Sequence, residues 1–505
     1  MTVSARYEEI KLPSGTTYKQ PLGFFINNEF HNSSNNEKMP VVYPVTGEQV
    51  CELEIASSTT DLNAAVKAAK DAFPIWKSTP ATVKRNLFFK LADLVEQNWE
   101  ILAEIESFDT GKPLANVSRG DIGRIIDCFR YYGGWIDKLH GQSFIPSDKK
   151  ICYTYHQPLG VVGCIIPFNY PLSLMSWKWT AIACGNTAVF KSAEQTPLTI
   201  LYFAQLVEKA GFPPGVFNVV TGYGKDLGDA LVKHLDICKI AFTGSTFAGQ
   251  LIQKNAAVNL KALTLECGGK SPIVIFDDCK FEQAVKWTCI GIFSNMGQIC
   301  SGTSRCYVQA GIYDKFIEAL VDHLDKYYKI GDPFDDKTMV GPLITKIQQQ
   351  RVLEYISTAI KEGCELVYGG LEKPQNISKC LEKGFYVRPT IFKDVEPHHT
   401  IFKEEVFGPV ISITKFDEFD KVLESCNDNQ YGLGAAIFTQ DITRATVFAR
   451  EIEAGMCWIN SSNDVDMNVP FGGIKMSGVG RELGEYGLAN FTNVKAVHLN
   501  LANDL

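Results

Sequence analysis

The sequence predicts an α/β protein of more than one domain, and three observations support this. A length of 505 residues is typical of a protein with two to four domains. Between Gly160 and Phe242, short apolar runs alternate with an amphipathic stretch, which indicates βαβ units and a parallel sheet. After Glu266 the same alternation starts again, which predicts a second α/β domain.

Two amphipathic stretches precede the first strands. Apolar residues recur at helical spacing from about Asp61 to Ala72, and again from about Ala81 to Glu106, and each stretch predicts one helix. The Asn/Ser-rich stretch Asn32–Asn36 is typical of a loop tip. The chain shows no repeat and no long linker, so we expect closely packed domains.

Four short apolar runs in the first alternating region predict buried strands. The run Gly160–Ile166 is bounded by Gly and Pro, as a buried strand would be. The others lie at Ala188–Lys191, Val216–Val220 and Lys239–Phe242. A helix is expected after the second run, with Thr196 as its N-cap, Pro197 at its first position and Gly211 at its end.

The second alternation begins with a predicted strand at Pro272–Phe276. A helix near Phe281–Phe293 and a strand at Arg305–Val308 follow it. The last segment, Phe491–Leu501, has the pattern of a strand beyond the end of this domain. An edge strand in that position is suited to pairing with another subunit.

Composition limits the function classes. The net charge of −8 and the pI near 5.6 argue against a nucleic-acid-binding protein, which usually carries a basic patch. Fifteen cysteines, an odd count without paired spacing, indicate a reducing compartment in which most thiols are small buried hydrophobes. No apolar run is long enough to span a membrane, and the N-terminus has no signal-peptide core, so we expect a cytoplasmic protein. The eight histidines lack metal-ligand spacing, so no metal site is expected.

A glycine pattern follows the predicted strand at Lys239–Phe242. Gly244 and Gly249 have the spacing of the outer glycines of a dinucleotide-binding fingerprint, with Thr246 in place of the middle glycine. A plain strand–turn–helix junction explains the same residues about equally well. The missing glycine also implies that a pyrophosphate would not be cradled in the usual way.

Two other residues are candidates for chemistry. Cys300 lies in a polar, glycine-punctuated turn with Arg305 nearby, and a reactive thiol needs partial exposure and an electropositive setting. A buried, inert thiol is the alternative. Glu266 stands at the end of an apolar strand just before Gly268 and Gly269, which suggests a buried base; a strand-end glutamate bonded to the backbone is equally consistent.

Six motifs together carry a resemblance to a known family. They are Pro167–Pro171, Phe242–Thr246, Leu265–Lys270, Gly297–Cys300, Glu404–Pro409 and Pro470–Gly473. In order and spacing they resemble the aldehyde dehydrogenase superfamily, from about Phe24 to Val497. The run Gln298–Ser301 and the ending Gly480–Gly487 look closest to the betaine-aldehyde and aminoaldehyde branch.

The resemblance implies an architecture and an assembly. We expect a Rossmann-like NAD-binding domain at residues 1–130 and 157–264, an α/β catalytic domain at 265–465, and a small β oligomerisation element at 131–156 and 486–505. The stretch near Lys149–His156, together with Phe491–Leu501, resembles the family's oligomerisation strands. The expected assembly is a homodimer or homotetramer.

The resemblance also implies a reaction, the NAD-dependent oxidation of an aldehyde to a carboxylate. Cys300 would be the nucleophile, and the side-chain amide of Asn169 with the backbone N–H of Cys300 would stabilise the oxyanion. Glu266 would activate the water that hydrolyses the thioester. Lys178 and Glu482 resemble a proton route behind them.

The remaining site residues are implied in three groups. The cofactor would lie against Pro167, Phe168, Lys191, Glu194, Gly244, Ser245, Gly249, Glu405 and Phe407. The aldehyde would lie against Tyr170, Trp177, Ser294 and Phe471. Because a carboxylate at the adenosine ribose repels a 2′-phosphate, Glu194 favours NAD over NADP.

Three departures from the family pattern bear on the substrate and the site. Phe168 stands where many relatives have Trp, Cys267 replaces the usual Leu, and Ser294 takes a position that is often aromatic. Aromatic tunnel residues and the loop aspartates Asp464 and Asp466 suggest an aldehyde that carries a cationic nitrogen. The alternative is a general aliphatic or aromatic aldehyde.

Three rival functions are weighed against this one. A cysteine hydrolase would need a His base, and none lies in the motifs. A non-enzymatic relative would not need the intact set of Cys300, Glu266, Asn169 and Glu405. Transfer of the acyl group to coenzyme A instead of water is disfavoured by the presence of Glu266.

Overall fold

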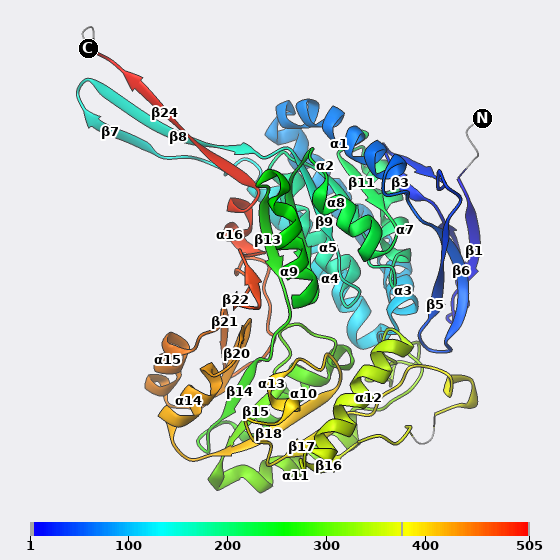
Figure 1. Ribbon diagram of the computed structural model, residues 1–505, viewed down its shortest axis with the longest axis vertical. Helices are drawn as coiled ribbons and strands as arrows, with labels where there is room; N and C mark the ends of the chain where they lie inside the picture. The colour runs from blue at the N-terminus through cyan, green and yellow to red at the C-terminus, as the bar shows by residue number, and fades with distance from the viewer. Residues whose placement is uncertain (1–4, 375–376, 503–505) are drawn as a thin grey trace.

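Two sheets, both largely parallel, form the two lobes of the computed structural model, and a narrow arm projects from the first lobe (Figure 1). The structure describes residues 5–374 and 377–502. The predicted α/β architecture with two alternating regions is confirmed. Across the described residues, no helix is both long and apolar enough to cross a membrane.

The sheet of the first lobe has eight strands in the order β23-β13-β12-β9-β10-β11-β3-β4. Its parallel strands are β9 (Val161–Ile165), β10 (Thr187–Lys191), β11 (Phe217–Val220), β12 (Ile237–Thr243) and β13 (Ala262–Glu266). Its antiparallel edges are β3 (Phe24–Ile26), β4 (Glu29–His31) and β23 (Gly478–Val479). The four strands predicted here from apolar runs are therefore present. The chain order reverses between β9 and β12, and ligands of open α/β sheets bind at such a switch point.

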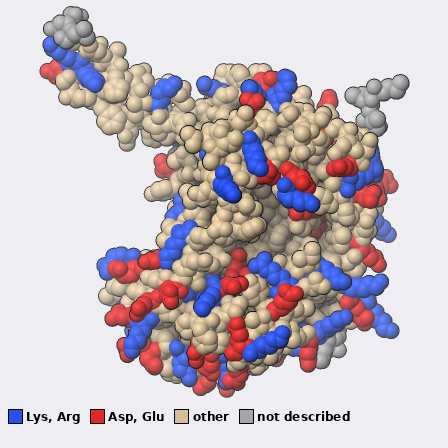
Figure 2. Space-filling model, in the orientation of Figure 1, with Lys and Arg blue, Asp and Glu red and all other residues tan. Residues whose placement is uncertain are grey.

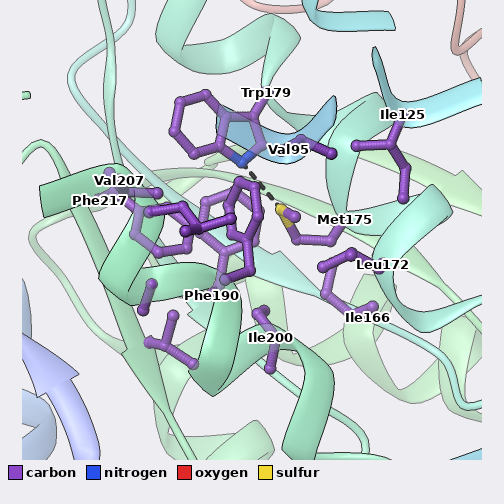
Figure 3. Close-up of a cluster of buried hydrophobic side chains, with 14 of the residues drawn as sticks. Val95, Ile125, Ile166, Leu172, Met175, Trp179, Phe190, Ile200, Val207 and Phe217 are labelled. Atoms are coloured by element: carbon purple, nitrogen blue, oxygen red, sulfur yellow. Dashed lines mark hydrogen bonds between the residues drawn. The ribbon is translucent and has the colours of Figure 1, made fainter. Parts of the chain in front are cut away.

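Helices cover both faces of this sheet (Figure 1). They are α1 (Thr60–Ser78), α2 (Ala81–Gln97), α3 (Trp99–Thr110), α4 (Arg119–Trp135), α5 (Pro171–Lys178), α6 (Thr180–Ala183), α7 (Leu198–Ala210), α8 (Asp229–Lys233) and α9 (Thr246–Ala256). The core between α2, α4, α7 and the sheet is built around Trp179, Phe190 and Phe217 (Figure 3). The indole Nε1 of Trp179 donates to Sδ of Met175 at 2.8 Å, so this buried polar atom is paired.

Two details of the helix predictions are wrong. The stretch predicted as one helix from Ala81 to Glu106 is two helices, because Asn98 ends α2 and precedes α3 with φ −106° and ψ 19°. Its side-chain amide donates to the Leu94 carbonyl at 2.7 Å, and this bond competes with helix continuation. In α7 the cap is not Thr196: the helix begins at Leu198, whose N–H donates to Asp109 Oδ2 at 2.7 Å. Because Asp109 lies on α3, no residue near the start of α7 in the sequence indicates this contact.

The second lobe contains a seven-stranded sheet in the order β16-β17-β18-β15-β14-β20-β21. The strands are β14 (Pro272–Ile275), β15 (Arg305–Gln309), β16 (Glu365–Tyr368), β17 (Thr390–Lys393), β18 (Val410–Phe416), β20 (Gly434–Phe438) and β21 (Met456–Ile459). Its helices are α10 (Phe281–Phe293), α11 (Tyr313–Tyr327), α12 (Lys346–Lys361), α13 (Thr400–Lys403), α14 (Phe419–Asn427) and α15 (Ile442–Glu451). The predicted elements at the start of this lobe are confirmed as β14, α10 and β15.

The arm is a three-stranded antiparallel sheet of β7 (Ser143–Ser147), β8 (Lys150–Pro158) and β24 (Thr492–Asn500). The predicted C-terminal strand is confirmed as β24, which pairs with β8 along its whole length and leaves its other edge open. Much of the arm is uncharged on the face in Figure 2. Its exposed apolar side chains include Phe144, Ile145, Tyr153, Val494 and Leu499.

The remaining short elements lie at the N-terminal side of the first lobe and between the lobes. The hairpins are β1 (Tyr7–Lys11) with β2 (Thr17–Pro21), and β5 (Lys38–Tyr43) with β6 (Glu48–Glu54). Another pair is β19 (Tyr431–Gly432) with β22 (Ile474–Lys475), and α16 (Gly484–Ala489) precedes β24. Strand β23 ties the C-terminal part of the chain back to the first sheet through β13.

Candidate active site

The carboxyl ends of the five parallel strands of the first lobe meet at one cavity of about 640 Å³. From this lobe it is lined by the segments that follow β9, β10, β11, β12 and β13. The second lobe supplies Cys300, Gln348, Arg351, Tyr355, Glu404, Glu405, Phe407, Gln430 and Tyr431. The cavity therefore lies where the strand order reverses, and both lobes contribute to it.

The N-terminus of α9 opens onto this cavity. Ser245 is the N-cap, and its hydroxyl accepts from the Ala248 N–H at 3.3 Å. Gly244 and Ser245 line the cavity beside it. At Gly244 a Cβ would lie 2.6 Å from the ring of Phe242, so a larger residue there would displace that ring. A helix N-terminus with its free N–H groups is a ready site for an anion.

Gly249, predicted beside them, lies elsewhere. It is buried within α9 and does not line the cavity. A Cβ there would approach Cys267 Sγ to 2.6 Å, so the glycine lets α9 pack against the segment that follows β13. Its part is helix–sheet packing, which is one of the glycine roles in dinucleotide-binding folds.

At the end of β10, Lys191 and Glu194 line the cavity together. The Lys191 ammonium is buried, donates to the Ser192 carbonyl at 2.8 Å, and lies 3.5 Å from Glu194 Oε2. Burial lowers the pKa of Lys191 from its ordinary value. The Glu194 side chain stays about one-third exposed, so it can meet a ligand.

The opposite wall comes from the segment after α13. Glu405 Oε1 accepts from the Gly269 N–H at 3.0 Å, and burial raises the pKa of Glu405 to about 7. Phe407 has a φ of 57°, which is unusual for a bulky residue, and its carbonyl accepts from Gln348 Nε2 at 2.9 Å. Its ring meets the Phe168 ring edge-on at 5.8 Å, and Pro167 lines the cavity beside Phe168.

A strained turn presents Cys300 to the cavity. Asn295 and Met296, both buried, have φ of 46° and 53°, and such backbone costs about 1–3 kcal/mol per residue. The turn is held across the lobes, because Asn295 Nδ2 donates to the Asn169 carbonyl at 3.0 Å. Asn169 Nδ2 in turn donates to the Gln298 carbonyl at 3.0 Å. The Asn169 amide is thus fixed next to the cysteine loop.

Cys300 and Glu266 both line this cavity, and their side chains interact with each other. Burial raises the pKa of Glu266 to about 8, and the charge of Glu482 adds to this effect. Burial and the neighbouring Glu266 carboxyl raise the pKa of the Cys300 thiol well above its ordinary value. Neither Glu266 oxygen has a hydrogen-bond partner within the described chain, so this carboxyl is not the backbone-bonded alternative.

The electropositive setting expected from Arg305 is wrong. The guanidinium is buried at the start of β15 and donates to the carbonyls of Lys270, Ser425 and Cys426. It points into the second lobe, because β15 begins beyond the cysteine turn and carries the side chain into the core. Sequence distance alone suggested a contact that the strand direction prevents.

Lys178 and Glu482 lie behind Glu266 as a buried ion pair. Lys178 Nζ is 2.7 Å from Glu482 Oε1 and 2.7 Å from Thr243 Oγ1. Glu482 Oε2 has no partner among the described residues. These two residues do not line the cavity, but a chain of polar groups runs from Lys178 to the end of β12.

The four predicted substrate residues lie away from the cavity wall. Trp177 and Phe471 pack against each other with ring centroids 5.0 Å apart. They belong to the first lobe's hydrophobic cluster, against which Cys300 and Tyr170 also pack. Ser294 is partly exposed at the start of the short helix η4 (Ser294–Gly297), which leads to Cys300. None of the four lines this cavity, although Tyr170 directly follows Asn169, which does.

Sequence reasoning missed two buried lysines. Lys112 pairs with Asp121 at 2.8 Å and Glu106 at 3.5 Å, and its ammonium lies 4.3 Å from the Tyr170 ring centroid. Lys270, inside one of the recognised motifs, has an Nζ without a partner in the described structure, and burial lowers its pKa to about 7. In the sequence, Lys270 could have been identified only by its position between Gly269 and the strand β14. No local sequence pattern indicates that Lys112 is buried.

Within residues 5–374 and 377–502, no group of three or more His, Cys, Asp or Glu side chains is arranged to hold a metal ion. The pair His398 and His399 lies in contact with Glu396 at the edge of the second lobe.

Comparison with known proteins gives consistent matches. The model of the aldehyde dehydrogenase family matches residues 30–497. Aldehyde dehydrogenase NAD(P)+ 1 of Saccharomyces cerevisiae is 44% identical over 99% of both chains. The NAD+ complex of an aldehyde dehydrogenase from Bacillus cereus is 43% identical, with a TM-score of 0.92, over 95% of this chain and 97% of that one.

A betaine aldehyde dehydrogenase from Staphylococcus aureus is also similar, at 35% identity and a TM-score of 0.92 over 96% of this chain and 98% of that one. The likeness to the betaine-aldehyde branch is therefore shared with other aldehyde dehydrogenases. It does not single that branch out.

Proposed function

This chain belongs to the aldehyde dehydrogenase family, and from that premise we propose that it oxidises an aldehyde to a carboxylate with NAD, through a thioester on Cys300. The observation that carries the proposal is that Cys300, Glu266 and Asn169 line one and the same cavity. The same cavity runs out to a helix N-terminus, as a dinucleotide site requires.

The residues present fit a nicotinamide dinucleotide. The N-terminus of α9, with Gly244 and Ser245, suits the pyrophosphate, and the partly exposed Glu194 suits a ribose hydroxyl. Glu405 and Phe407 would hold the second ribose on the opposite wall. When bound, the nicotinamide supplies the acceptor for the hydride that leaves the adduct on Cys300.

Acylation begins with the Cys300 thiol. Burial opposes the thiolate, so the thiol has to give its proton to water in the cavity before the sulfur attacks, and this step does not require Glu266. The thiolate sulfur then forms a bond to the aldehyde carbon. The oxygen gains the negative charge, and Asn169 Nδ2 with the Cys300 N–H donates to it. Loss of hydride from the carbon leaves the thioester.

Deacylation needs water and the Glu266 carboxylate. Glu266 takes a proton from water, the hydroxide adds to the thioester carbon, and the C–S bond breaks to give the carboxylate and the Cys300 sulfur, which regains a proton. The buried pair Lys178–Glu482 lies behind Glu266. It supports a route by which the proton taken from water leaves Glu266 towards Thr243. This is the second half of the proposed cycle.

Of the two substrate classes, the described contacts favour the uncharged aldehyde. The Lys112 ammonium already lies over the Tyr170 ring, so that face is not open to a second cation. Trp177 and Phe471 are buried against each other. The exposed Asp464 and Asp466 favour the cationic class, but solvation weakens their attraction.

Comparison of two aldehydes of similar length decides between these classes. Hexanal should have a higher kcat/KM than 4-trimethylaminobutyraldehyde at low salt, where electrostatic attraction is strongest. The reverse order would support the cationic aldehyde. In the same assay, NADH formation distinguishes the dehydrogenase from a cysteine hydrolase, and Cys300→Ala should abolish it while NAD binding remains.

The arm and the domain boundaries complete the proposal. We assign cofactor binding to residues 1–130 and 157–264, catalysis to 265–465, and oligomerisation to 131–156 and 486–505. The exposed apolar side chains of β7, β8 and β24 and the open edge of β24 support a homodimer or homotetramer. Light scattering of the purified chain measures which one forms.

A further inference from the structure

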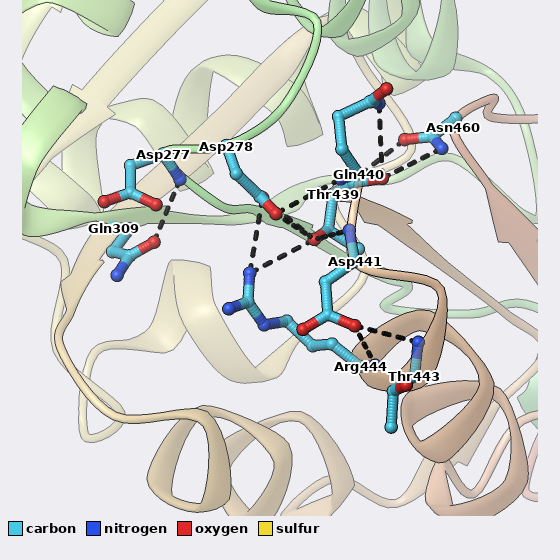
Figure 4. A network of polar contacts seen from close by, with 9 residues as sticks. All are labelled: Asp277, Asp278, Gln309, Thr439, Gln440, Asp441, Thr443, Arg444 and Asn460. Atoms are coloured by element: carbon cyan, nitrogen blue, oxygen red, sulfur yellow. Dashed lines mark hydrogen bonds and ion pairs between the residues drawn. The ribbon is translucent and has the colours of Figure 1, made fainter.

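A loop from Asn460 to Phe471 links β21 to the apolar cluster behind Cys300. Its beginning is held firmly. Asn460 uses both ends of its amide on the Thr439 backbone, accepting from N–H at 3.1 Å and donating to C=O at 3.0 Å. Thr439 is held in turn by Asp278 at 2.8 Å, and Asp278 by Arg444 at 3.3 Å (Figure 4). The network fixes the point from which the loop leaves the sheet.

The next residues of this loop reach the cysteine turn. Ser301, directly after Cys300, is 3% exposed and donates through Oγ to Asn463 Oδ1 at 2.5 Å. Asn463 Nδ2 donates to the Gly291 carbonyl at 2.9 Å. One side chain thus connects the cysteine turn to the last turns of α10. Asn463 has a φ of 56°, a conformation that asparagine tolerates better than most residues.

A second contact lies beside the first. Ser462 Oγ is 3.1 Å from Thr303 Oγ1, and the Thr303 N–H donates to the same Gly291 carbonyl at 3.1 Å. A Cβ on Gly291 would lie 2.3 Å from Thr303 Oγ1 and 2.5 Å from Ser462 Oγ. The three segments meet so closely that only glycine fits. The junction therefore joins α10, the cysteine turn and the loop as one packed unit.

From this geometry we infer that Asn463 is a positioning residue for acylation, which holds the Cys300 sulfur in its attacking place through Ser301. The inference rests on the proposed function, because it gives Cys300 the nucleophilic role. The cysteine turn contains two strained residues, Asn295 and Met296, and such a turn keeps its shape only when its surroundings hold it. Asn169 holds its beginning, and Asn463 holds its end.

The same loop continues into a wall of apolar residues that contains Phe471, one of the residues predicted to contact the substrate. Val465 packs against the apolar cluster of the first lobe, and Met467 and Phe471 belong to it. Trp458 Nε1 donates to the Asp464 carbonyl at 2.8 Å and steadies the middle of the loop. The placement of the sulfur and of this wall therefore depends on one segment, and small displacements at a reacting atom cost large factors in rate.

The test uses Asn463→Ala, Ser301→Ala and the double variant in the full chain. Two rates are measured: the pre-steady-state burst of NADH, and alkylation of Cys300 by iodoacetamide with the labelled peptide identified by mass spectrometry. Each single variant should lower both rates roughly tenfold, the scale of losing one buried hydrogen bond. The dissociation constant for NAD should not change. The double variant should be no slower than the slower single variant, because both remove the same bond.

Asn427→Ala is the matched control. Asn427 is also partly buried and also bridges two backbone groups, donating to the Glu451 carbonyl at 3.0 Å and accepting from the Glu453 N–H at 2.8 Å. It lies on α14, and both rates should remain normal when it is removed. If Asn463→Ala matches Asn427→Ala in both rates, or if the two single effects add in the double variant, the inference is overturned.

Asn463→Asp carries the test if the alanine variant does not fold. Aspartate keeps the acceptor for Ser301 and adds a negative charge beside the cysteine turn, so the midpoint of the alkylation pH profile should move to higher pH. An unchanged profile would overturn the inference. Failure of the proposed function has a different signature: a normal NADH burst in Cys300→Ala would reject Cys300 itself, whatever Asn463 does.

Discussion

Replacing Glu266 by Gln tests the carboxyl group at the centre of the site. The amide has nearly the same shape and cannot take a proton from water. Acylation should survive and deacylation should fail, so the variant should give a single-turnover burst of NADH and then almost no steady-state rate. In the wild type the deacylation rate should rise with pH to a midpoint near 8, because the carboxyl must lose its proton first.

The burial of the Glu266 carboxyl should also make the stability of the folded protein depend on pH, and the size of this dependence follows from the change in pKa. The pKa of Glu266 rises from 4.5 to about 8 because its charged form is buried. That difference corresponds to about 5 kcal/mol. The unfolded chain loses the proton near 4.5, and the folded chain keeps it to about 8. The protonated Glu266 carboxyl therefore adds its full contribution to the free energy of unfolding below pH 4.5. This contribution falls as the pH rises and is lost once the pH has passed through about 8.

Thermal unfolding of both proteins from pH 5 to pH 9 measures that effect. Gln carries no charge at either pH, so the Tm of Glu266→Gln relative to wild type should increase with pH. For 505 residues unfolding together, 5 kcal/mol corresponds to about 5 °C. A Tm difference that stays constant with pH would refute the burial argument. A normal steady-state rate in the variant would refute Glu266 as the base.

Three further predictions concern the rest of the site and the arm. Asn169→Ala should lower kcat by roughly 100-fold, the scale of losing an oxyanion donor, with unchanged NAD binding in a fluorescence titration; a loss below fivefold would contradict the role. The wild type should prefer NAD, and Glu194→Gln should narrow the ratio of kcat/KM for NAD and NADP, because the repulsion of a 2′-phosphate is removed; equal values in the wild type would argue against it. Val494→Glu places a charge on the exposed apolar arm and should lower the mass measured by light scattering, whereas an unchanged mass would exclude this face from the assembly.

Much of the fold follows from local pattern in the sequence. The strands β9 to β12 are short apolar runs between Gly, Pro and polar turns, and such runs identify buried parallel strands. The errors arose where a distant partner decides the structure. Asp109 of α3 caps α7, and no feature near Thr196 could reveal that. Asn98 interrupts a continuous helical pattern because its side chain bonds its own helix.

In the candidate site, too, local motifs revealed some residues, whereas others depend on partners that are distant in the sequence. Cys300 and Glu266 came from motifs, and the structure brings them together at one cavity. The position of Arg305 was misjudged because strand direction, not sequence distance, decides where its side chain goes. Lys112 could not be found, since its partners Glu106 and Asp121 come from separate helices and meet only in the folded chain.

The claim that the reaction passes through a thioester on Cys300 is tested most directly by locating the acyl group. Glu266→Gln would be mixed with NAD and hexanal, quenched in acid at the end of the burst, digested and analysed by mass spectrometry. The account predicts the acyl mass on the peptide that contains Cys300, in an amount equal to the NADH formed. NADH formation without an acylated Cys300, or with the acyl group on Cys306, would contradict it.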